Sequence, residues 1–113
     1  MPRKSSSTVK VFYPRYSREE VLHHIRASLP LLREALPVLS VVLFGSYAKG
    51  TNTAFSDIDL LVVYQDPPRQ DAYTLVKRSI PLRGLEPHVY ARSEYEQVND
   101  VVERMIEGGV RVV

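Results

Sequence analysis

The sequence predicts a single α/β domain with α+β character, in which helices pack on one face of a small mixed sheet. Three apolar, strand-like runs at residues 38–44, 57–64 and 85–91 alternate with segments of helical periodicity. The chain has 113 residues, which leaves no room for a second hydrophobic core. We expect residues 1–16 to form a partly disordered N-terminal arm and residues 17–113 to form the domain.

The composition argues against several classes of protein. The chain has no cysteine, so disulfides and thiolate metal sites are excluded. No apolar run approaches the roughly 20 residues of a membrane span, and the first residues lack the apolar stretch of a secretory signal. The net charge is only +2, which gives little support to nucleic-acid binding. We therefore expect a cytoplasmic protein without a membrane partner; nucleic acid is not favoured but stays open.

A capping box predicts the start of the first helix. Ser17 and Glu20 stand three residues apart, so their side chains can satisfy N–H groups at the helix start reciprocally. Pro30 lies inside the helical pattern, and we expect it to kink the helix or end it early, because proline lacks a donor and crowds the preceding turn. The apolar positions of this helix are Val21, Leu22, Ile25, Leu29, Leu32 and Leu36.

The stretch between the first two strands carries the strongest chemical signal. The first apolar run stops at Gly45-Ser46, and after a short polar segment the second run begins with Asp57 and Asp59. Strand side chains alternate with period two, so Asp57 and Asp59 point to the same side. Two carboxylates this close repel each other unless a cation lies beside them. Mg²⁺ is a common cation beside such a pair, because it binds one or two carboxylates together with substrate phosphates.

The turn after the first strand can supply a seat for such phosphates. Gly45 lets the backbone approach a ligand without a Cβ in the way. Residues 46–49 can begin a short helix, whose free N–H groups favour an anion. Lys49 either reaches a phosphate or points to water. Ser56 lies just before the Asp pair, where its hydroxyl is better placed to brace the loop than to take part directly.

Two further helices and a third strand complete the domain. Residues 71–79 have one apolar helical face, and the strand at 85–91 contains Pro87, which suggests an edge strand or a local irregularity. A second capping box, Ser93 with Glu96, predicts the start of the last helix. Its core stripe consists of Val98, Val101, Val102, Met105 and Ile106.

The C-terminal end follows Gly108-Gly109, which terminates the last helix. Residues 110–113 are apolar and form either a short last strand or an interface segment. A homo-oligomer or a complex with another chain therefore stays open.

The pattern Gly45-Ser46, ten residues, then Asp57-x-Asp59 resembles the signature of the DNA polymerase β-like nucleotidyltransferase superfamily. In detail it is similar to the minimal nucleotidyltransferase branch, with Gly-Ser-x-Ala-x-Gly followed by Ser-Asp-Ile-Asp-Leu-Leu-Val. The motif covers about a fifth of the chain, and the length and order of elements extend the resemblance to most of it. The competing interpretation is an Asp-rich turn with glycines that serve only the loop. The resemblance implies the polymerase β-like nucleotidyltransferase fold.

The resemblance also implies an enzyme that transfers a nucleoside monophosphate from a nucleoside triphosphate, ATP being the expected donor, to a hydroxyl. Asp57 and Asp59 would bind Mg²⁺ with the triphosphate, and two ions are expected. The nucleotide-binding candidates are Gly45, Ser46, Lys49 and Ser56.

A third catalytic and metal-binding acid comes from a neighbouring strand in this superfamily, and Glu86 is the only acid on the third predicted strand. The superfamily more often has Asp there. Glu86, His88 and Tyr90 share one face by parity, so His88 would line the site if Glu86 faces it. The alternative is that Glu86 ends a loop and His88 packs against the sheet.

Minimal members of the superfamily are often encoded beside a small helical HEPN partner and commonly form toxin–antitoxin pairs. The resemblance thus implies an antitoxin that adenylylates a tyrosine of a HEPN-type partner toxin. Two alternatives stay open. One is a non-catalytic binding module that neutralises a partner by contact alone, and the other is a catalytic subunit for an RNA or small-molecule acceptor.

Overall fold

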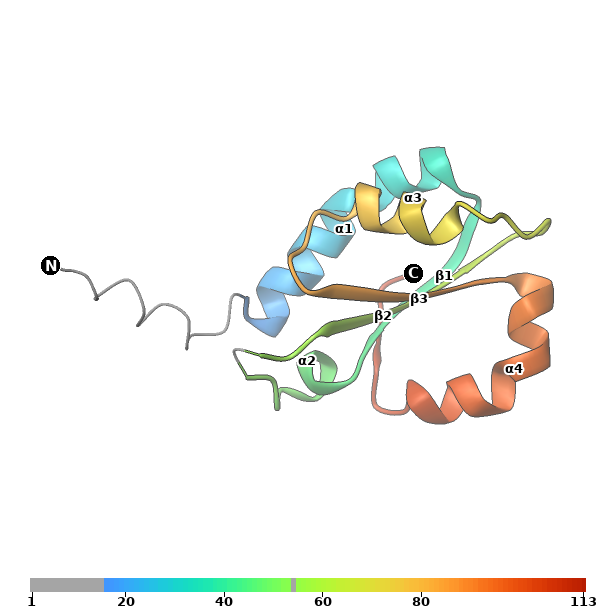
Figure 1. Ribbon diagram of the computed structural model, residues 1–113. Coiled ribbons are helices and arrows are strands. Elements are labelled where there is room, and N and C mark those ends of the chain that lie inside the picture. The colour runs from blue at the N-terminus through green and yellow to red at the C-terminus, as the bar shows by residue number, and fades with distance from the viewer. Residues whose placement is uncertain (1–15, 54) are drawn as a thin grey trace, which may run out of the picture.

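The computed structural model describes residues 16–53 and 55–113 (Figure 1). Apart from Tyr16, the arm expected at residues 1–16 lies outside the described residues. The elements run in the order α1 (Arg18–Ala35), β1 (Val38–Phe44), α2 (Ser46–Lys49), β2 (Ile58–Tyr64), α3 (Ala72–Ser79), β3 (Leu85–Ala91), α4 (Arg92–Met105) and β4 (Val110–Arg111).

The strands form one mixed sheet in the order β3-β2-β1-β4. Strand β1 pairs antiparallel with both β2 and β4, whereas β2 and β3 are parallel. The parallel pair needs a crossover connection, and α3 lies in it. This arrangement confirms the predicted α/β class and the mixed sheet. It also resolves the alternative for the C-terminal end: Val110 and Arg111 form a short strand on β1.

The helices cover both faces of the sheet. Helices α1 and α3 lie over one face, and α4 lies over the other (Figure 1). The prediction that helices cover one face is therefore wrong for α4. The physical reason is that the middle of β1 and β2 is apolar at consecutive positions, so both faces must be covered. On the α4 face, Val102 packs with Val42, Phe44, Leu61 and Val63.

The capping box at α1 is confirmed. The Glu20 N–H donates to Ser17 Oγ at 3.1 Å, and the Ser17 N–H donates to Glu20 Oε1 at 2.8 Å. The expectation that Pro30 ends the helix early is wrong, because α1 continues to Ala35. Pro30 is exposed, so its ring faces solvent, while buried Leu32 anchors the following turn in the core.

The second capping box is displaced. Strand β3 runs directly into α4, which begins at Arg92 rather than after Ser93. Glu94 Oε1 accepts the Ala91 N–H at 2.8 Å, and the Ser93 hydroxyl instead donates to Asp66 Oδ1 at 2.7 Å. The expected pairing of Ser93 with Glu96 is therefore wrong.

Among the helices seen in residues 16–53 and 55–113, none has the length and apolarity needed to span a bilayer.

Candidate functional site

The sheet brings Asp59 and Glu86 to the same end: Asp59 is on the α4 face, and Glu86 is on the edge strand β3, where its Oε1 approaches Tyr73 of α3. Asp59 on β2 is in register with Phe44 at the end of β1 and with Glu86 near the start of β3. Asp59 alternates with buried Ile58 and Leu60, which face α1 and α3, so its side chain is on the opposite face. Asp57 directly precedes β2, which begins at Ile58, and its charge acts on Asp59.

Gly45 packs its backbone directly on the Asp59 carboxylate. It caps the start of α2 with φ of 77° and ψ of −155°, a region that only glycine adopts readily. A Cβ built on Gly45 would lie 2.5 Å from Asp59 Oδ2. The turn between β1 and α2 therefore leaves no space for a side chain between the backbone and this carboxylate.

The short helix α2 starts at the same corner. The Lys49 N–H donates to the Gly45 carbonyl at 3.1 Å, and the Thr51 N–H donates to the Ser46 carbonyl at 3.0 Å. The first N–H groups of a helix have no carbonyl partner within it, so those that begin with Ser46 lie at the Gly45 turn. The other end of α2 is tied to α1, because Arg18 Nη1 donates to the Ala48 carbonyl at 3.1 Å.

The electrostatics converge on Asp59. Partial burial is the main cause that raises the pKa of this carboxyl above its usual value, and the charges of Asp57 and Glu86 raise it further. His88 acts in the opposite direction; its Nε2 lies 3.7 Å from Asp59 Oδ1. The negative charges of Asp57 and Glu86 therefore act on Asp59 at this end of the sheet. A bound cation would reduce the repulsion among the three carboxylates.

The acids do not form a complete metal cage by themselves. In residues 16–53 and 55–113, no three acidic, histidine or cysteine side chains are arranged to hold an ion. Asp57 and Glu86 are exposed, and Glu86 Oε1 accepts the Tyr73 hydroxyl at 3.5 Å. Mg²⁺ in proteins is usually bound by one or two carboxylates with water and substrate phosphates. The Asp57–Asp59 pair beside the Gly45 turn fits that mode of binding.

The structure places Lys49 and Ser56 differently from the acids. Ser56 Oγ accepts the Thr53 N–H at 2.8 Å, so its hydroxyl braces the loop before β2. Lys49 is exposed at the end of α2 opposite Gly45, and its Cε is 3.6 Å from the position of a Cβ on Gly108. In this conformation the structure does not direct Lys49 toward Asp59.

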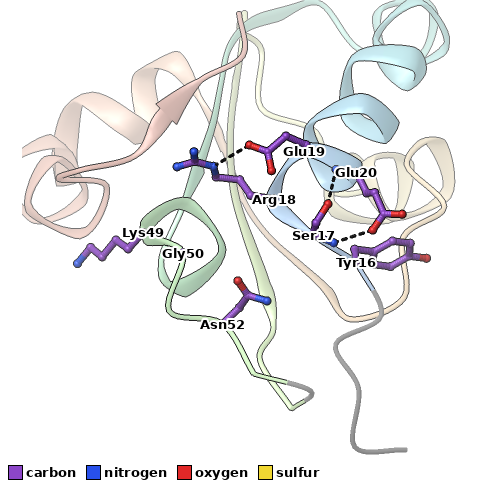
Figure 2. Close-up of a pocket in the computed structure, with 8 residues that line it drawn as sticks. All are labelled: Tyr16, Ser17, Arg18, Glu19, Glu20, Lys49, Gly50 and Asn52. Carbon is purple, nitrogen blue, oxygen red and sulfur yellow. Dashed lines mark hydrogen bonds and ion pairs between the residues drawn. The ribbon is translucent and has the colours of Figure 1, made fainter. Parts of the chain in front are cut away.

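A separate hollow of about 650 Å³ lies between the start of α1 and the loop after α2. Figure 2 shows the Lys49 side chain pointing away from the other drawn residues. The acids on β2 and β3 do not line it. Sequence reasoning did not find this hollow, because its walls come from two distant segments. Its lining residues are Tyr16, Ser17, Arg18, Glu19, Glu20, Lys49, Gly50 and Asn52.

The model of the nucleotidyltransferase domain family, NTP_transf_2, matches residues 25–111. The chain belongs to this family, and the enzyme class predicted from Gly45-Ser46 and Asp57-x-Asp59 is confirmed: it is a nucleotidyltransferase.

Curated relatives come from Methanocaldococcus jannaschii. Putative protein adenylyltransferase MJ1379 is 29% identical over 91 residues, which cover 78% of this chain and 89% of that protein. Putative protein adenylyltransferase MJ1305 is 48% identical over 33 residues, which cover 29% of this chain and 22% of that protein. The match to MJ1305 thus spans about a fifth of that relative's length.

Solved structures show the same fold. A crystal structure of a putative nucleotidyltransferase from Sulfolobus solfataricus has a TM-score of 0.57 at 20% identity, and the match covers 98% of this chain and 89% of that one. A crystal structure of a toxin-antitoxin with AMP-PNP has a TM-score of 0.56 at 20% identity, covering 78% of this chain and 72% of that one. At these identities the likeness establishes the fold.

Proposed function

We propose that this chain is a Mg²⁺-dependent adenylyltransferase that transfers AMP from ATP to a tyrosine of a HEPN-type partner toxin and thereby acts as an antitoxin. The observation that carries the nucleotide site is the packing of the Gly45 turn on the Asp59 carboxylate. A protein acceptor is supported by the names of the curated relatives, and a toxin partner by a structural neighbour.

Each residue has a distinct role in this proposal. Asp57 and Asp59 would hold Mg²⁺, with Glu86 as the third acid. When bound, the metal would neutralise triphosphate charge and lower the pKa of the attacking hydroxyl. Gly45 lets the turn pack closely on Asp59, and the free N–H groups that begin at Ser46 would favour the charge of a phosphate beside that carboxylate.

The supporting residues act more indirectly. Ser56 keeps the loop before β2 in shape through its bond to Thr53. Lys49, whose Cε lies near Gly108, stays a candidate contact for the nucleotide. Catalysis at such a site consists mainly of positioning and charge stabilisation.

Isothermal titration of ATP into the full chain tests the nucleotide site. We expect binding that requires Mg²⁺ and that disappears in the Asp57→Asn/Asp59→Asn variant, because the pair loses the charge that attracts the ion. Asp100→Asn, an exposed acid on α4, is the matched control and should bind as the wild type does. Equal binding by wild type and double variant would contradict the proposal.

The acceptor is tested by mass spectrometry of the co-expressed toxin partner. We expect a gain of one adenylyl group on the partner, located on a tyrosine, and no gain when that tyrosine is phenylalanine. Comparison of ATP with GTP, CTP and UTP identifies the donor base. A partner that stays unmodified while its toxicity is suppressed would exclude transfer as the antitoxin mechanism.

Neutralisation by contact alone is the second candidate, and the state of the acids favours it. Glu86 is exposed, its Oε1 faces the Tyr73 hydroxyl on α3, and the acids are not assembled as a metal cage within the part of the chain that the structure covers. A pure binding module needs no such assembly.

The variant Glu86→Gln separates these two functions. If Glu86 holds the metal, we expect transfer to fall by about 100-fold or more, the size of effect seen when one stabilising group is removed from a transition state. Partner binding should be unchanged, since a single charge on an edge strand is removed. Rates of AMP transfer and pull-down of the partner measure the two effects.

The control for this prediction is Tyr73→Phe, which removes only the hydroxyl that approaches Glu86 Oε1. It should leave transfer near the wild-type rate. Wild-type transfer by Glu86→Gln would remove Glu86 from the catalytic set.

A further inference from the structure

His88 makes a contact with Asp59 that the proposed roles do not use. It lies on β3, two residues beyond Glu86, and its ring packs against Phe44 with the ring centroids 5.1 Å apart. Its Nε2 is shielded from solvent and has no hydrogen-bond partner within the described part of the chain. The Asp59 Oδ1 atom, 3.7 Å away, faces this nitrogen.

The chemistry of the contact indicates which form of the ring is present. An Nε2 lone pair directed at a carboxylate oxygen would be repelled, whereas an Nε2–H group is attracted to it. A shielded N–H without a partner is costly. The Nε2–H tautomer avoids the repulsion, because its hydrogen is directed toward Asp59 Oδ1; at 3.7 Å the contact is an electrostatic attraction and not a hydrogen bond.

The two oxygens of Asp59 therefore have different surroundings. Oδ2 lies against the Gly45 turn, where the phosphates of the nucleotide are proposed to bind. Oδ1 lies toward His88 on the neighbouring strand. A contact that attracts Oδ1 restricts rotation of the Asp59 carboxylate, and so restricts the directions in which Oδ2 can point.

We infer that His88 is a positioning residue: its Nε2–H attracts Asp59 Oδ1 and so keeps Oδ2 directed toward the Gly45 turn and the proposed nucleotide site. This inference rests on the proposed function, because it assigns the orientation of one of that site's ligands. A partner that orients a metal ligand typically changes metal affinity by 10- to 100-fold when removed. The competing role for His88 is packing alone, as an aromatic neighbour of Phe44.

Two substitutions distinguish positioning from packing. His88→Leu retains an apolar side chain against Phe44 but has no N–H donor. His88→Gln places an amide N–H close to where Nε2 stands but has no ring. His23→Leu, the same change at an exposed position of α1, is the control. The measurements are Mg²⁺-dependent ATP affinity by isothermal titration and the thermal melting temperature of each full chain without nucleotide.

We expect His88→Leu to weaken Mg²⁺-dependent ATP binding by about 10- to 100-fold, with His88→Gln recovering most of the affinity and His23→Leu unchanged. Equal affinity of His88→Leu and wild type would overturn the inference. So would equal weakening by His88→Leu and His88→Gln, since the ring rather than the N–H would then be needed. If the wild type itself fails to bind ATP with Mg²⁺, the proposed function fails and the inference falls with it.

Discussion

Gly45→Ala is expected to abolish Mg²⁺-dependent ATP binding and to lower the stability of the chain. The new Cβ would lie 2.5 Å from Asp59 Oδ2 and 3.3 Å from its Cγ, so the carboxylate or the turn must move. The φ of 77° with ψ of −155° adds backbone strain on the order of 1–3 kcal/mol. Thermal melting and ATP titration on the same sample measure both effects.

Gly50→Ala is the matched control for this substitution. Gly50 also has φ of 77°, but a Cβ there would meet nothing within 4 Å. We expect it to cost about 1–2 kcal/mol of stability from left-handed backbone strain and to keep ATP affinity. The difference between the two variants contains the contact with Asp59 and the extra backbone strain at Gly45, whose ψ is −155° against 17° at Gly50.

Coupling between Gly45 and Asp59 provides a second check on the Gly45 prediction. In an Asp59→Ala background the Oδ2 and Cγ atoms are absent, so Gly45→Ala should cost less stability than it does in the wild type. The same cost in both backgrounds, or undiminished ATP binding by Gly45→Ala, would show that the turn does not press on the carboxylate.

The strands could be predicted because they depend on local pattern. The runs at 38–44 and 85–91 coincide with β1 and β3, and β2 begins one residue later than predicted, at Ile58. The same-side placement of Asp57 with Asp59 stays a prediction, because Asp57 precedes β2. The placement of α4 on the second face of the sheet also has a signal in the sequence. Consecutive apolar positions in β1 and β2 indicate burial of both faces, which requires a helix on each.

Contacts between strands could not be predicted in the same way. The approach of His88 Nε2 to Asp59 Oδ1 depends on the parallel register of β2 and β3, and no local periodicity fixes that register. The bond from Arg18 to the Ala48 carbonyl joins residues 30 positions apart, again without a sequence signal. The start of α4 at Arg92 was missed because the Ser93 hydroxyl bonds to Asp66 instead of capping the helix.

Asp59→Asn is expected to eliminate transfer while it stabilises the chain without ligand at neutral pH. Burial, with the charges of Asp57 and Glu86, raises the pKa of Asp59 despite the opposing effect of His88. The folded state therefore binds the proton of Asp59 more tightly than the unfolded state does. The ionised group lowers stability at neutral pH, and a neutral amide of the same shape removes that penalty. Transfer should fall by at least about 100-fold.

The pH dependence gives this prediction its sharpest form. A raised carboxyl pKa contributes stability below the unfolded pKa, near 3.9, and that contribution is lost as the pH rises through the folded value. The melting temperature of Asp59→Asn minus that of wild type should therefore grow over this range and then level off. Added Mg²⁺ with ATP should raise the melting temperature of wild type but not of the variant, because ligands stabilise the state that binds them. Asp100→Asn should follow wild type in both series. If Asp59→Asn melts below wild type at neutral pH, the ionised carboxylate stabilises the chain without ligand. The claim that repulsion among Asp57, Asp59 and Glu86 destabilises it would then be wrong.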